Sequence, residues 1–346
     1  MAAAGLTAEI KALALELGFV RVGIAKAERL AEDDARLAAW LEAGHHGQMA
    51  YMQETAAVRA DPTHPAMLPS ARSVIVLVSA YAQSRALQGL APGRIARYAQ
   101  GRDYHGLLYD RTRAIKRRLR AAGANARACV DTLPALERAW AARSGVGFVG
   151  KNACLIVPGV GSHVLLSLVL TNAELEADAP IKERCGECRL CLDACPTQAF
   201  VGPRQLDARR CVSYLTIEHE GAIEADLRAG MGEWLFGCDV CQDVCPYNRT
   251  AQAPAVTPDP FAPRGRLTEL GVEDFLRMDE AGFDAYTRGS ALRRAGREGM
   301  ARNAAIVLGN AGDKRHLPVL RHAADRDGSE VVREAARWAL ARLESG

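Results

Sequence analysis

Hydrophobic residues recur at helical spacing in several segments of the chain. Ile10–Leu17 has this spacing near the N-terminus, and Tyr109–Ala122 predicts a basic helix. After residue 265 the sequence is rich in Ala and helical in character. There, Arg302-Asn-Ala-Ala and Arg333-Glu-Ala-Ala recur 31 residues apart, each leading into an apolar helix. This period is typical of stacked helical hairpins of the HEAT type, although two copies also fit an unrelated helical cap.

Uninterrupted apolar runs predict strands in the N-terminal half. Val74–Val78 is a run of mostly β-branched residues, as in a strand that is buried on both faces. Leu155–Val157 and Val164–Leu170 predict two further strands, joined at the turn PGVGS. We therefore expect residues 1–175 to form a layered domain of the α/β or α+β class.

Residues 176–260 differ from the segments on either side. They contain eight of the ten cysteines and few long apolar runs. Because such a segment has little ordinary core, a bound metal is expected to stabilise it. The Pro-rich stretch 253–265 is interpreted as a linker. The chain is thus predicted to have three parts: 1–175, 176–260 and 266–346.

The overall composition is that of an ordinary globular protein, with 346 residues, 49% hydrophobic residues, 25% charged residues and a net charge of +3. The longest apolar stretches, Ser73–Ala82 and Val164–Leu170, are well short of the roughly 20 residues of a membrane-spanning helix. The N-terminus has no signal-peptide pattern. We therefore expect a cytoplasmic protein with no membrane partner, whose cysteines serve metal or redox chemistry rather than disulfides.

Positive charge is concentrated in two places. Between Arg85 and Arg127 there are eleven Arg or Lys residues against only Asp103 and Asp110. Each cluster alone could be a solvated helix face, but two clusters in a chain of modest net charge favour a polyanionic partner. The second cluster, which is opposed by Glu298 alone, contains Arg288, Arg293, Arg294, Arg297 and Arg302.

The cysteines follow the spacing of iron–sulfur proteins. The run from Cys185 to Cys195 is C-x2-C-x2-C-x3-C-P, the bacterial ferredoxin pattern, in which the fourth cysteine binds the other cluster. A second run, C-x2-C-x3-C-P from Cys238 to Cys245, lacks one cysteine, and Cys211 is the only nearby replacement. One 4Fe-4S cluster is therefore predicted to bind Cys185, Cys188, Cys191 and Cys245, and the other to bind Cys195, Cys211, Cys238 and Cys241.

A zinc ribbon is the structural alternative, because paired C-x2-C motifs also bind zinc. Zinc needs neither two C-P endings nor a triple C-x2-C-x2-C run, so the iron–sulfur interpretation is favoured. The two remaining cysteines, Cys129 and Cys154, are predicted to be small core residues.

Two clusters in one chain form an electron path that needs an acceptor. The segment Gly145–Gly150 matches GxGxxG, but a helical stretch precedes it and a strand-like one follows, which is the reverse of a dinucleotide-binding motif. We interpret it as a tight turn. The acceptor is then an external protein or a cofactor without a short motif, such as base-off cobalamin. Asp131 is a candidate proton source, although by position alone it is an N-cap.

Several segments, in this order, resemble the epoxyqueuosine reductase family, whose members modify tRNA with cobalamin and iron–sulfur clusters. The resemblance covers nearly the whole chain and extends through both cysteine runs. The order of motifs is more specific for this family than the cysteines alone. It runs RYAxGRDYH, VDTLPALER and GKN, followed by the cysteines. The matching segments are His46–Met52, Leu68–Ser73, Arg97–His105, Val130–Arg138, Gly147–Asn152 and Arg210–Glu218.

The resemblance implies an α+β multidomain fold: a nitroreductase-like cobalamin domain, a ferredoxin-like two-cluster domain and a C-terminal HEAT-like helical repeat. It implies that an epoxide on the wobble base of a tRNA anticodon loses its oxygen as water and becomes an alkene. Electrons would pass from the clusters to cobalamin, and Asp131 would be the proton donor. The partners would be tRNA carrying epoxyqueuosine and an unidentified electron donor, with the enzyme acting as a monomer.

The resemblance also implies a cobalamin cleft, which includes Asp131 itself. The basic clusters would contact tRNA phosphates, and our candidates for these contacts are Arg293, Arg294 and Arg297. With 5% aromatic residues, the sequence singles out no residue that stacks on a base. The other positions that match the cobalamin cleft are Arg59, Lys151, Asn152, Leu155 and Ser213.

Two other functions compete with this interpretation. A cobalamin-dependent reductive dehalogenase would share the cofactors, but basic clusters and a helical repeat suit a small organohalide poorly. A ferredoxin-type electron carrier would have no use for the 175-residue domain ahead of the clusters. A cobalamin absorption band in the purified protein would distinguish the carrier from either enzyme.

Overall fold

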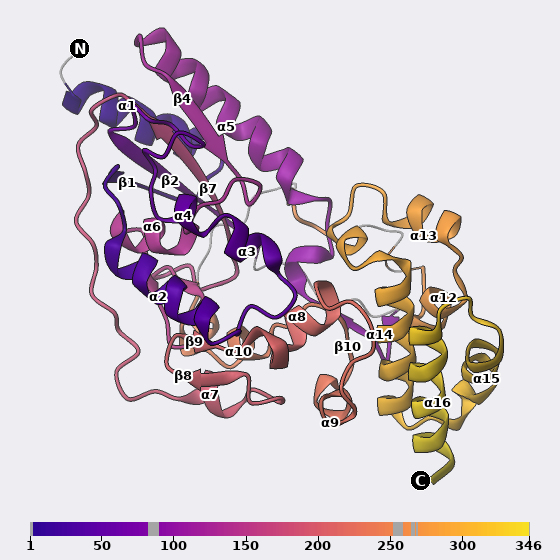
Figure 1. The fold of residues 1–346 in the computed structure, drawn as a ribbon. Coiled ribbons are helices and arrows are strands. Elements are labelled where there is room, and N and C mark those ends of the chain that lie inside the picture. The colour runs from indigo at the N-terminus through magenta and orange to yellow at the C-terminus, as the bar shows by residue number, and fades with distance from the viewer. Residues whose placement is uncertain (1–2, 82–89, 252–258, 264–266, 268, 346) are drawn as a thin grey trace.

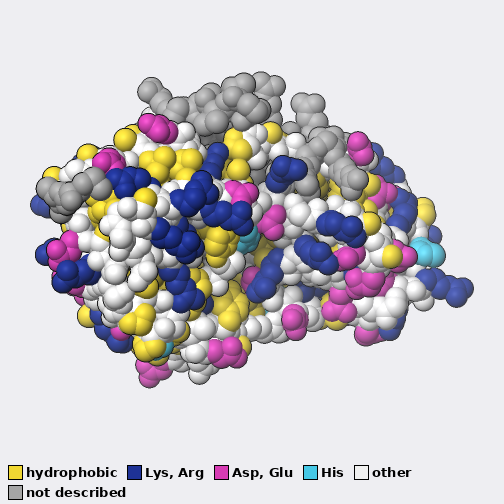
Figure 2. All heavy atoms as spheres, turned by 90° about the horizontal axis from the view of Figure 1, so that it is seen from above, with side chains coloured by type: hydrophobic (Ala, Val, Ile, Leu, Met, Phe, Trp, Pro, Cys, Tyr) yellow, Lys and Arg dark blue, Asp and Glu magenta, His cyan; other side chains and the backbone are white. Residues whose placement is uncertain are grey.

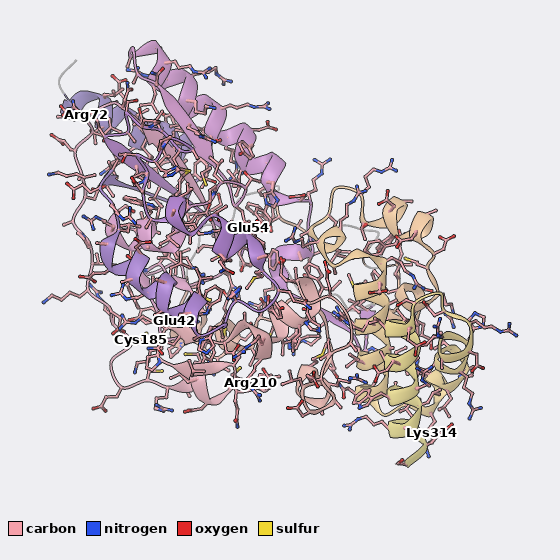
Figure 3. All side chains as sticks on the ribbon, viewed as in Figure 1. Glu42, Glu54, Arg72, Cys185, Arg210 and Lys314 are labelled. Carbon is pink, nitrogen blue, oxygen red and sulfur yellow. The ribbon has the colours of Figure 1, made fainter. Side chains whose placement is uncertain are left out.

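The computed structural model describes residues 3–81, 90–251, 259–263, 267 and 269–345. Figure 1 shows a sheet flanked by helices at one end of the molecule and a group of packed helices at the other. The cysteine-rich segment lies along one side and reaches both. In Figure 3, Cys185 and Arg210 mark this segment, Arg72 marks the sheet end, and Lys314 marks the helical end.

The N-terminal part is built on a four-stranded antiparallel sheet with the order β1-β2-β7-β4. The predicted strands at Val74–Val78 and Val164–Leu170 are confirmed and are slightly longer than predicted. The sequence pattern missed the two outer strands. The four strands are β1 (Arg21–Lys26), β2 (Ser73–Ala80), β4 (Ala126–Cys129) and β7 (Val164–Thr171).

Both faces of the sheet are covered, which explains the continuous apolar run of β2. Val74, Val76 and Val78 point into one core, and Ile75 and Leu77 point into the other. Helices α1 and α5 cover the second core, and α6 packs on the first. The predicted helices at Ile10–Leu17 and Tyr109–Ala122 are confirmed as α1 and α5. The helices of this part are α1 (Ala3–Glu16), α2 (Ala31–Glu42), α3 (Ala50–Glu54), α4 (Ala56–Arg59), α5 (Tyr104–Ala121) and α6 (Glu137–Arg143).

The segment with the GxGxxG spacing is a turn that enters a two-stranded sheet. Strand β5 (Phe148–Val149) lies inside the motif and pairs antiparallel with β6 (Leu155–Ile156). Gly147 is required by close packing, because a Cβ there would lie 2.5 Å from the Ile156 carbonyl oxygen. The helix before it and the strand after it confirm that this is no dinucleotide-binding motif. The turn PGVGS does link β6 to β7, but these strands belong to different sheets.

The cysteine-rich segment contains only short elements. Strand β10 (Trp234–Phe236) pairs in parallel with β3 (Arg94–Ile95), so a strand from the N-terminal part completes this segment. The other elements are α7 (Leu190–Asp193), β8 (Phe200–Gly202), β9 (Gln205–Leu206), α8 (Val212–Ile217), α9 (Ala225–Arg228), α10 (Val240–Asp243) and α11 (Pro246–Arg249).

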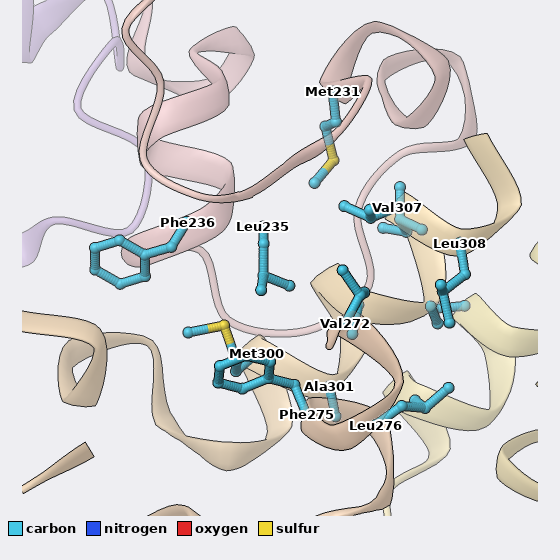
Figure 4. Close-up of a cluster of buried hydrophobic side chains, with 14 of the residues drawn as sticks. Met231, Leu235, Phe236, Val272, Phe275, Leu276, Met300, Ala301, Val307 and Leu308 are labelled. Atoms are coloured by element: carbon cyan, nitrogen blue, oxygen red, sulfur yellow. The ribbon is translucent and has the colours of Figure 1, made fainter. Parts of the chain in front are cut away.

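The C-terminal helices pack on the cysteine-rich segment through one continuous core. Figure 4 shows Met231, Leu235 and Phe236 facing Val272, Phe275 and Met300 across this core. Within it, the Ala pairs of the two recurring sequences are buried where α14 and α16 meet. The helices are α12 (Val272–Arg277), α13 (Glu280–Thr287), α14 (Gly296–Ala311), α15 (Leu317–Arg326) and α16 (Glu330–Ser345).

The structure confirms a mixed fold of helices and strands, whereas the nitroreductase-like and HEAT-like assignments stay predictions. So do the three domain boundaries, and the shared core crosses the one predicted before residue 266. Most of the predicted linker 253–265 lies outside the described residues. Among the helices in the described ranges, none has the length and hydrophobicity needed to cross a bilayer.

Candidate functional site

Asp131 lies in an exposed loop directly after strand β4. Its backbone has a φ of 55°, a left-handed conformation that is uncommon outside Gly. Its N–H donates a 2.9 Å hydrogen bond to Glu137 Oε1, and its side chain is 60% exposed. Helix α6 begins only at Glu137 and is preceded by Leu136 at the N-cap position. The interpretation of Asp131 as an N-cap is therefore wrong, and its carboxylate is left for other partners.

Those partners come from the beginning of helix α5. Tyr104 Oη donates a 2.7 Å hydrogen bond to Asp131 Oδ2, and His105 Nε2 lies 3.6 Å from the same oxygen. On its other side, His105 Nδ1 lies 2.6 Å from Asp103 Oδ1. Asp103 also caps α5 by accepting the His105 backbone N–H. The rings of Tyr104 and His105 stack with centroids 4.2 Å apart, so each fixes the other.

The charges of this group depend on one another. Hydrogen bonding to Asp103 and the neighbouring Asp131 raise the pKa of His105 to about 9, against the effect of burial. His105 is the largest cause that lowers the pKa of Asp131, and Tyr104 adds to it. Burial, followed by the charge of Asp131, raises the pKa of Glu137 to about 7. At neutral pH the resting site therefore contains an imidazolium beside a carboxylate.

An exposed aromatic ring lies close to the Asp131 loop. Tyr51 is 39% exposed, and the guanidinium groups of Arg59 and Arg294 lie 5.8 Å and 5.9 Å from its ring centroid. The Asp131 carboxylate is near enough to affect the pKa of both Tyr51 and Arg59, although burial is the largest cause of each shift. Arg294 in turn makes a bidentate ion pair with Glu218. The sequence pattern did not single out Tyr51.

The cysteine thiols fall into two sets. Burial raises the pKa of Cys191, and the thiols of Cys245 and Cys188 raise it further. Burial likewise raises the pKa of Cys238 to about 12, with further contributions from Cys211 and Cys195. The remaining two cysteines follow the same division. Cys191 contributes to the raised pKa of Cys185, and Cys238 contributes to the raised pKa of Cys241.

In the described part of the chain, the thiols are spread more widely than the ligands of a single metal ion. Among the described residues, no three side chains of His, Cys, Asp or Glu converge closely enough to hold one metal ion. A cubane places four irons between its four thiolates, so its ligands are spaced more widely than those of one ion. The assignment of four cysteines to each cluster stays a prediction from the cysteine spacing.

The two remaining cysteines differ in their surroundings. Cys129 is fully buried in the core beneath the sheet, as predicted. Cys154 is partly exposed and belongs to no hydrophobic core cluster in the described part of the chain. It lies within hydrogen-bonding reach of Cys241 instead. The prediction of a core residue was therefore wrong for Cys154, because the loop after β5 packs against the cysteine runs.

Three of the residues matched to a cobalamin cleft contact the cysteine runs. Asn152 Nδ2 donates to the Cys241 carbonyl, and Lys151 Nζ donates to the Gly186 carbonyl. The backbone N–H of Ser213 points at the Cys211 thiol. These residues therefore border the cysteine runs.

Arg59 lies beside the Asp131 loop, because its carbonyl accepts the N–H of Leu136 in that loop. Leu155 is buried on β6. Arg138, which follows Glu137, donates to the Ala153 carbonyl and so links the Asp131 loop to the loop after β5. The Asp131 loop is therefore linked to the cysteine runs through Arg138, the Ala153 carbonyl and the neighbouring Asn152.

The three arginines proposed to contact tRNA have different surroundings. Arg293 and Arg294 are exposed and pair with Asp284 and Glu218. Arg297 is only 14% exposed and makes a bidentate ion pair with Asp327, which is 3% exposed. Figure 2 shows Lys and Arg side chains over both the sheet part and the helical part of one face, with acidic side chains among them.

Comparisons with known proteins agree with these features. Residues 59–132 match a family model described as epoxyqueuosine reductase QueG, DUF1730, and residues 184–248 match a 4Fe-4S double cluster binding domain. The chain is 43% identical to the epoxyqueuosine reductase of Pseudomonas aeruginosa, over 98% of this chain and 95% of that protein. It is 40% identical to that of Xanthomonas campestris, over 97% of this chain and 95% of that protein.

Solved structures of the same enzyme match nearly the whole chain. One is a crystal structure of epoxyqueuosine reductase with an epoxyqueuosine-modified stem loop of tRNA-Tyr. It has a TM-score of 0.89 and 29% identity, over 98% of this chain and 90% of that one. Another, from Bacillus subtilis, has its catalytic aspartate loop swung out of the active site. It has a TM-score of 0.87 at the same identity and coverage.

Proposed function

Because the chain belongs to the epoxyqueuosine reductase family, a family of oxidoreductases, we propose that it reduces epoxyqueuosine to queuosine at the wobble position of tRNA anticodons. The observation that carries this proposal is the group around Asp131. An exposed carboxylate, in contact with a tyrosine and near a histidine, lies in the loop before Arg138. Arg138 contacts Ala153, next to Asn152, which bonds the backbone of Cys241. This arrangement joins a proton donor to a source of electrons.

The reaction removes one oxygen from the substrate. Two electrons and two protons convert the epoxide into an alkene and water. Two 4Fe-4S clusters and a cobalamin, when bound, supply the electrons one at a time. The protein's own part is to hold the base and deliver protons, and Asp131 is the group that protonates the leaving oxygen. Its left-handed backbone and its hydrogen bond from Tyr104 support this role, because both fix the direction of the carboxylate.

The cofactors are assigned to the residues that border them. One cluster is assigned to Cys185, Cys188, Cys191 and Cys245, and the other to Cys195, Cys211, Cys238 and Cys241. Cobalamin is assigned to Arg59, Asp131, Lys151, Asn152, Leu155 and Ser213.

The RNA is assigned to the face that carries Arg293 and Arg294, which are exposed and able to exchange a carboxylate partner for phosphate. Arg297 is assigned to the support of this face, because its guanidinium is occupied and largely buried. Tyr51 offers an exposed ring near Asp131 on which an unstacked base can lie. The enzyme is proposed to act as a monomer, with an electron donor that is unidentified.

The test is anaerobic turnover of an anticodon stem-loop RNA that contains epoxyqueuosine, with reconstituted protein, cobalamin and dithionite. Nucleoside mass spectrometry should show the loss of one oxygen from the modified base. Asp131→Asn should keep the iron content and the RNA affinity and lose about 10²-fold or more in rate. No conversion by protein with both clusters and cobalamin bound would refute the proposed substrate.

A further inference from the structure

The proposed reaction needs two protons at one oxygen, and a carboxylic acid carries one. When the carbon–oxygen bonds break and the oxygen leaves as water, two O–H bonds form. Asp131 must therefore receive a second proton during the reaction, or start each turnover from a protonated neighbour. Its backbone conformation and its contact with Tyr104 hold it in place, so a protonated group within reach of its side chain can supply this proton faster than water at neutral pH.

Tyr104 and His105 both lie within reach, but the Tyr104 phenol is a weak acid whose pKa is raised further by burial and by Asp131. His105 is the stronger acid, and it is held on both sides by carboxylates. Nε2 of His105 lies 3.6 Å from Asp131 Oδ2. Nδ1 lies 2.6 Å from Asp103 Oδ1, which is a short contact that fixes the imidazole. His105 is 33% exposed, so it can exchange protons with water.

The charges around the imidazole favour its protonated form. Asp103 and Asp131 both raise the pKa of His105, which reaches about 9. The stacked ring of Tyr104 faces it from the neighbouring position, and the pKa of that phenol is raised by burial and by Asp131, so it stays neutral. Arg138 acts on Asp131 from the other side of the loop and lowers its pKa. The resting pair therefore has its proton on the histidine.

We propose that His105, oriented by Asp103, stores the proton that recharges Asp131 during removal of the epoxide oxygen. The Nε2–H bond of His105 breaks, an O–H bond forms on the Asp131 carboxylate, and the neutral imidazole regains a proton from water. The two electrons come from the reduced cofactors. His105 acts through Asp131 and is a positioning residue in this scheme, as is Asp103. The inference rests on the proposed function.

The experiment compares His105→Gln and Asp103→Asn with wild type in single-turnover conversion of the stem-loop RNA across alkaline pH. Wild type should lose activity as pH rises through about 9, the value at which His105 gives up its proton. His105→Gln should be about 10²-fold slower at neutral pH and should lack this alkaline decline. Asp103→Asn should move the decline to lower pH. His322→Gln, an exposed histidine on α15, is the matched control.

A second readout is independent of turnover. In the holoenzyme labelled with ¹⁵N at histidine, the signal missing from His105→Gln should titrate near pH 9 in wild type and at lower pH in Asp103→Asn. If wild type converts the RNA and His105→Gln matches its rate and pH profile, this inference is overturned while the proposed function stands. If wild type converts no RNA, the proposed function itself is overturned.

Discussion

Replacement of Arg297 by Ala should unfold part of the C-terminal helices without acting on RNA directly. Its guanidinium bonds both carboxylate oxygens of Asp327 at 2.8 Å and 2.6 Å, and its Nε donates to the Met278 carbonyl at 2.8 Å. These contacts tie the first turn of α14 to the end of α12 and to the turn before α16. Arg297 thus holds three helices together.

The magnitude follows from burial. Removing one partner of a buried ion pair typically costs about 3–5 kcal/mol, because the other charge stays buried without compensation. Asp327 is 3% exposed, so this range applies to Arg297→Ala. Arg293 and Asp284 are 55% and 50% exposed, and such a surface pair contributes about 0–1 kcal/mol. A difference of about 1.4 kcal/mol corresponds to a factor of ten in an equilibrium constant. Arg297→Ala should therefore raise the equilibrium constant for local unfolding by between about 10²- and 10⁴-fold.

Hydrogen–deuterium exchange measures this difference for each helix separately. A melting curve does not, because a multidomain protein with bound clusters does not unfold in one two-state step. Protection of α14 and α16 should fall by that factor in Arg297→Ala and stay close to wild type in Arg293→Ala. RNA affinity should fall in Arg293→Ala and stay close to wild type in Arg297→Ala. In Arg293→Ala, the dependence of RNA affinity on salt concentration should decrease by the equivalent of about one phosphate contact. Unchanged exchange together with weakened RNA binding in Arg297→Ala would refute the reasoning.

The double variant Arg297→Met with Asp327→Asn is the control for the stranded charge. It removes both charges and keeps the Asn oxygen available to the Ser329 N–H, which Asp327 binds at 2.9 Å in wild type. It should be more protected than Arg297→Ala. Burial is the largest single influence and raises the pKa of Asp327, but Arg297, the Ser329 N–H and Arg333 together lower it overall. The pair therefore stabilises the fold above the unfolded carboxyl pKa, and the stabilisation is lost as pH falls through the lower folded value.

Two further predictions concern the clusters and the Asp131 loop. Cys188→Ser and Cys211→Ser should each lose iron from a different cluster, while Cys154→Ala should keep the wild-type iron content, all measured by iron analysis and electron paramagnetic resonance. Glu137→Ala should slow single turnover, because the Asp131 N–H loses its acceptor, whereas Glu137→Gln should stay close to wild type since its side-chain oxygen still accepts. Equal rates for the two Glu137 variants would show that this hydrogen bond does not position the loop.

The predictability of the fold depended on how strongly each segment is buried. Strands β2 and β7 are apolar on both faces, so their sequence alone marks them. Strand β1 begins with Arg21 and ends with Lys26, both exposed, and β4 is four residues long. Their strand structure comes from pairing with β2 and β7, which no local pattern records.

The candidate site shows the same limit at the level of side chains. Cysteine spacing predicts a domain with two 4Fe-4S clusters, which the match over residues 184–248 confirms, while the assignment of each cysteine to a cluster stays a prediction. The partners of Asp131 were not predictable, because Tyr104 and His105 lie more than twenty residues before it and meet it only through the packing of α5 on the sheet. Tyr51 gains its setting from Arg294, which is contributed by the other end of the chain.

The C-terminal helices are joined to the catalytic group and are not a separate docking arm. Their core is continuous with that of the cysteine-rich segment. The buried guanidinium of Arg302 donates to the carbonyls of Leu215, His219 and Gly221 around the end of α8. At the other end of the interface, the Asp103 N–H donates to the Gly289 carbonyl, close to Arg293 in sequence. If RNA binds at Arg293 as proposed, it would be anchored to the same backbone that positions Asp103, so even a short helical region could align the substrate with the proposed proton donor.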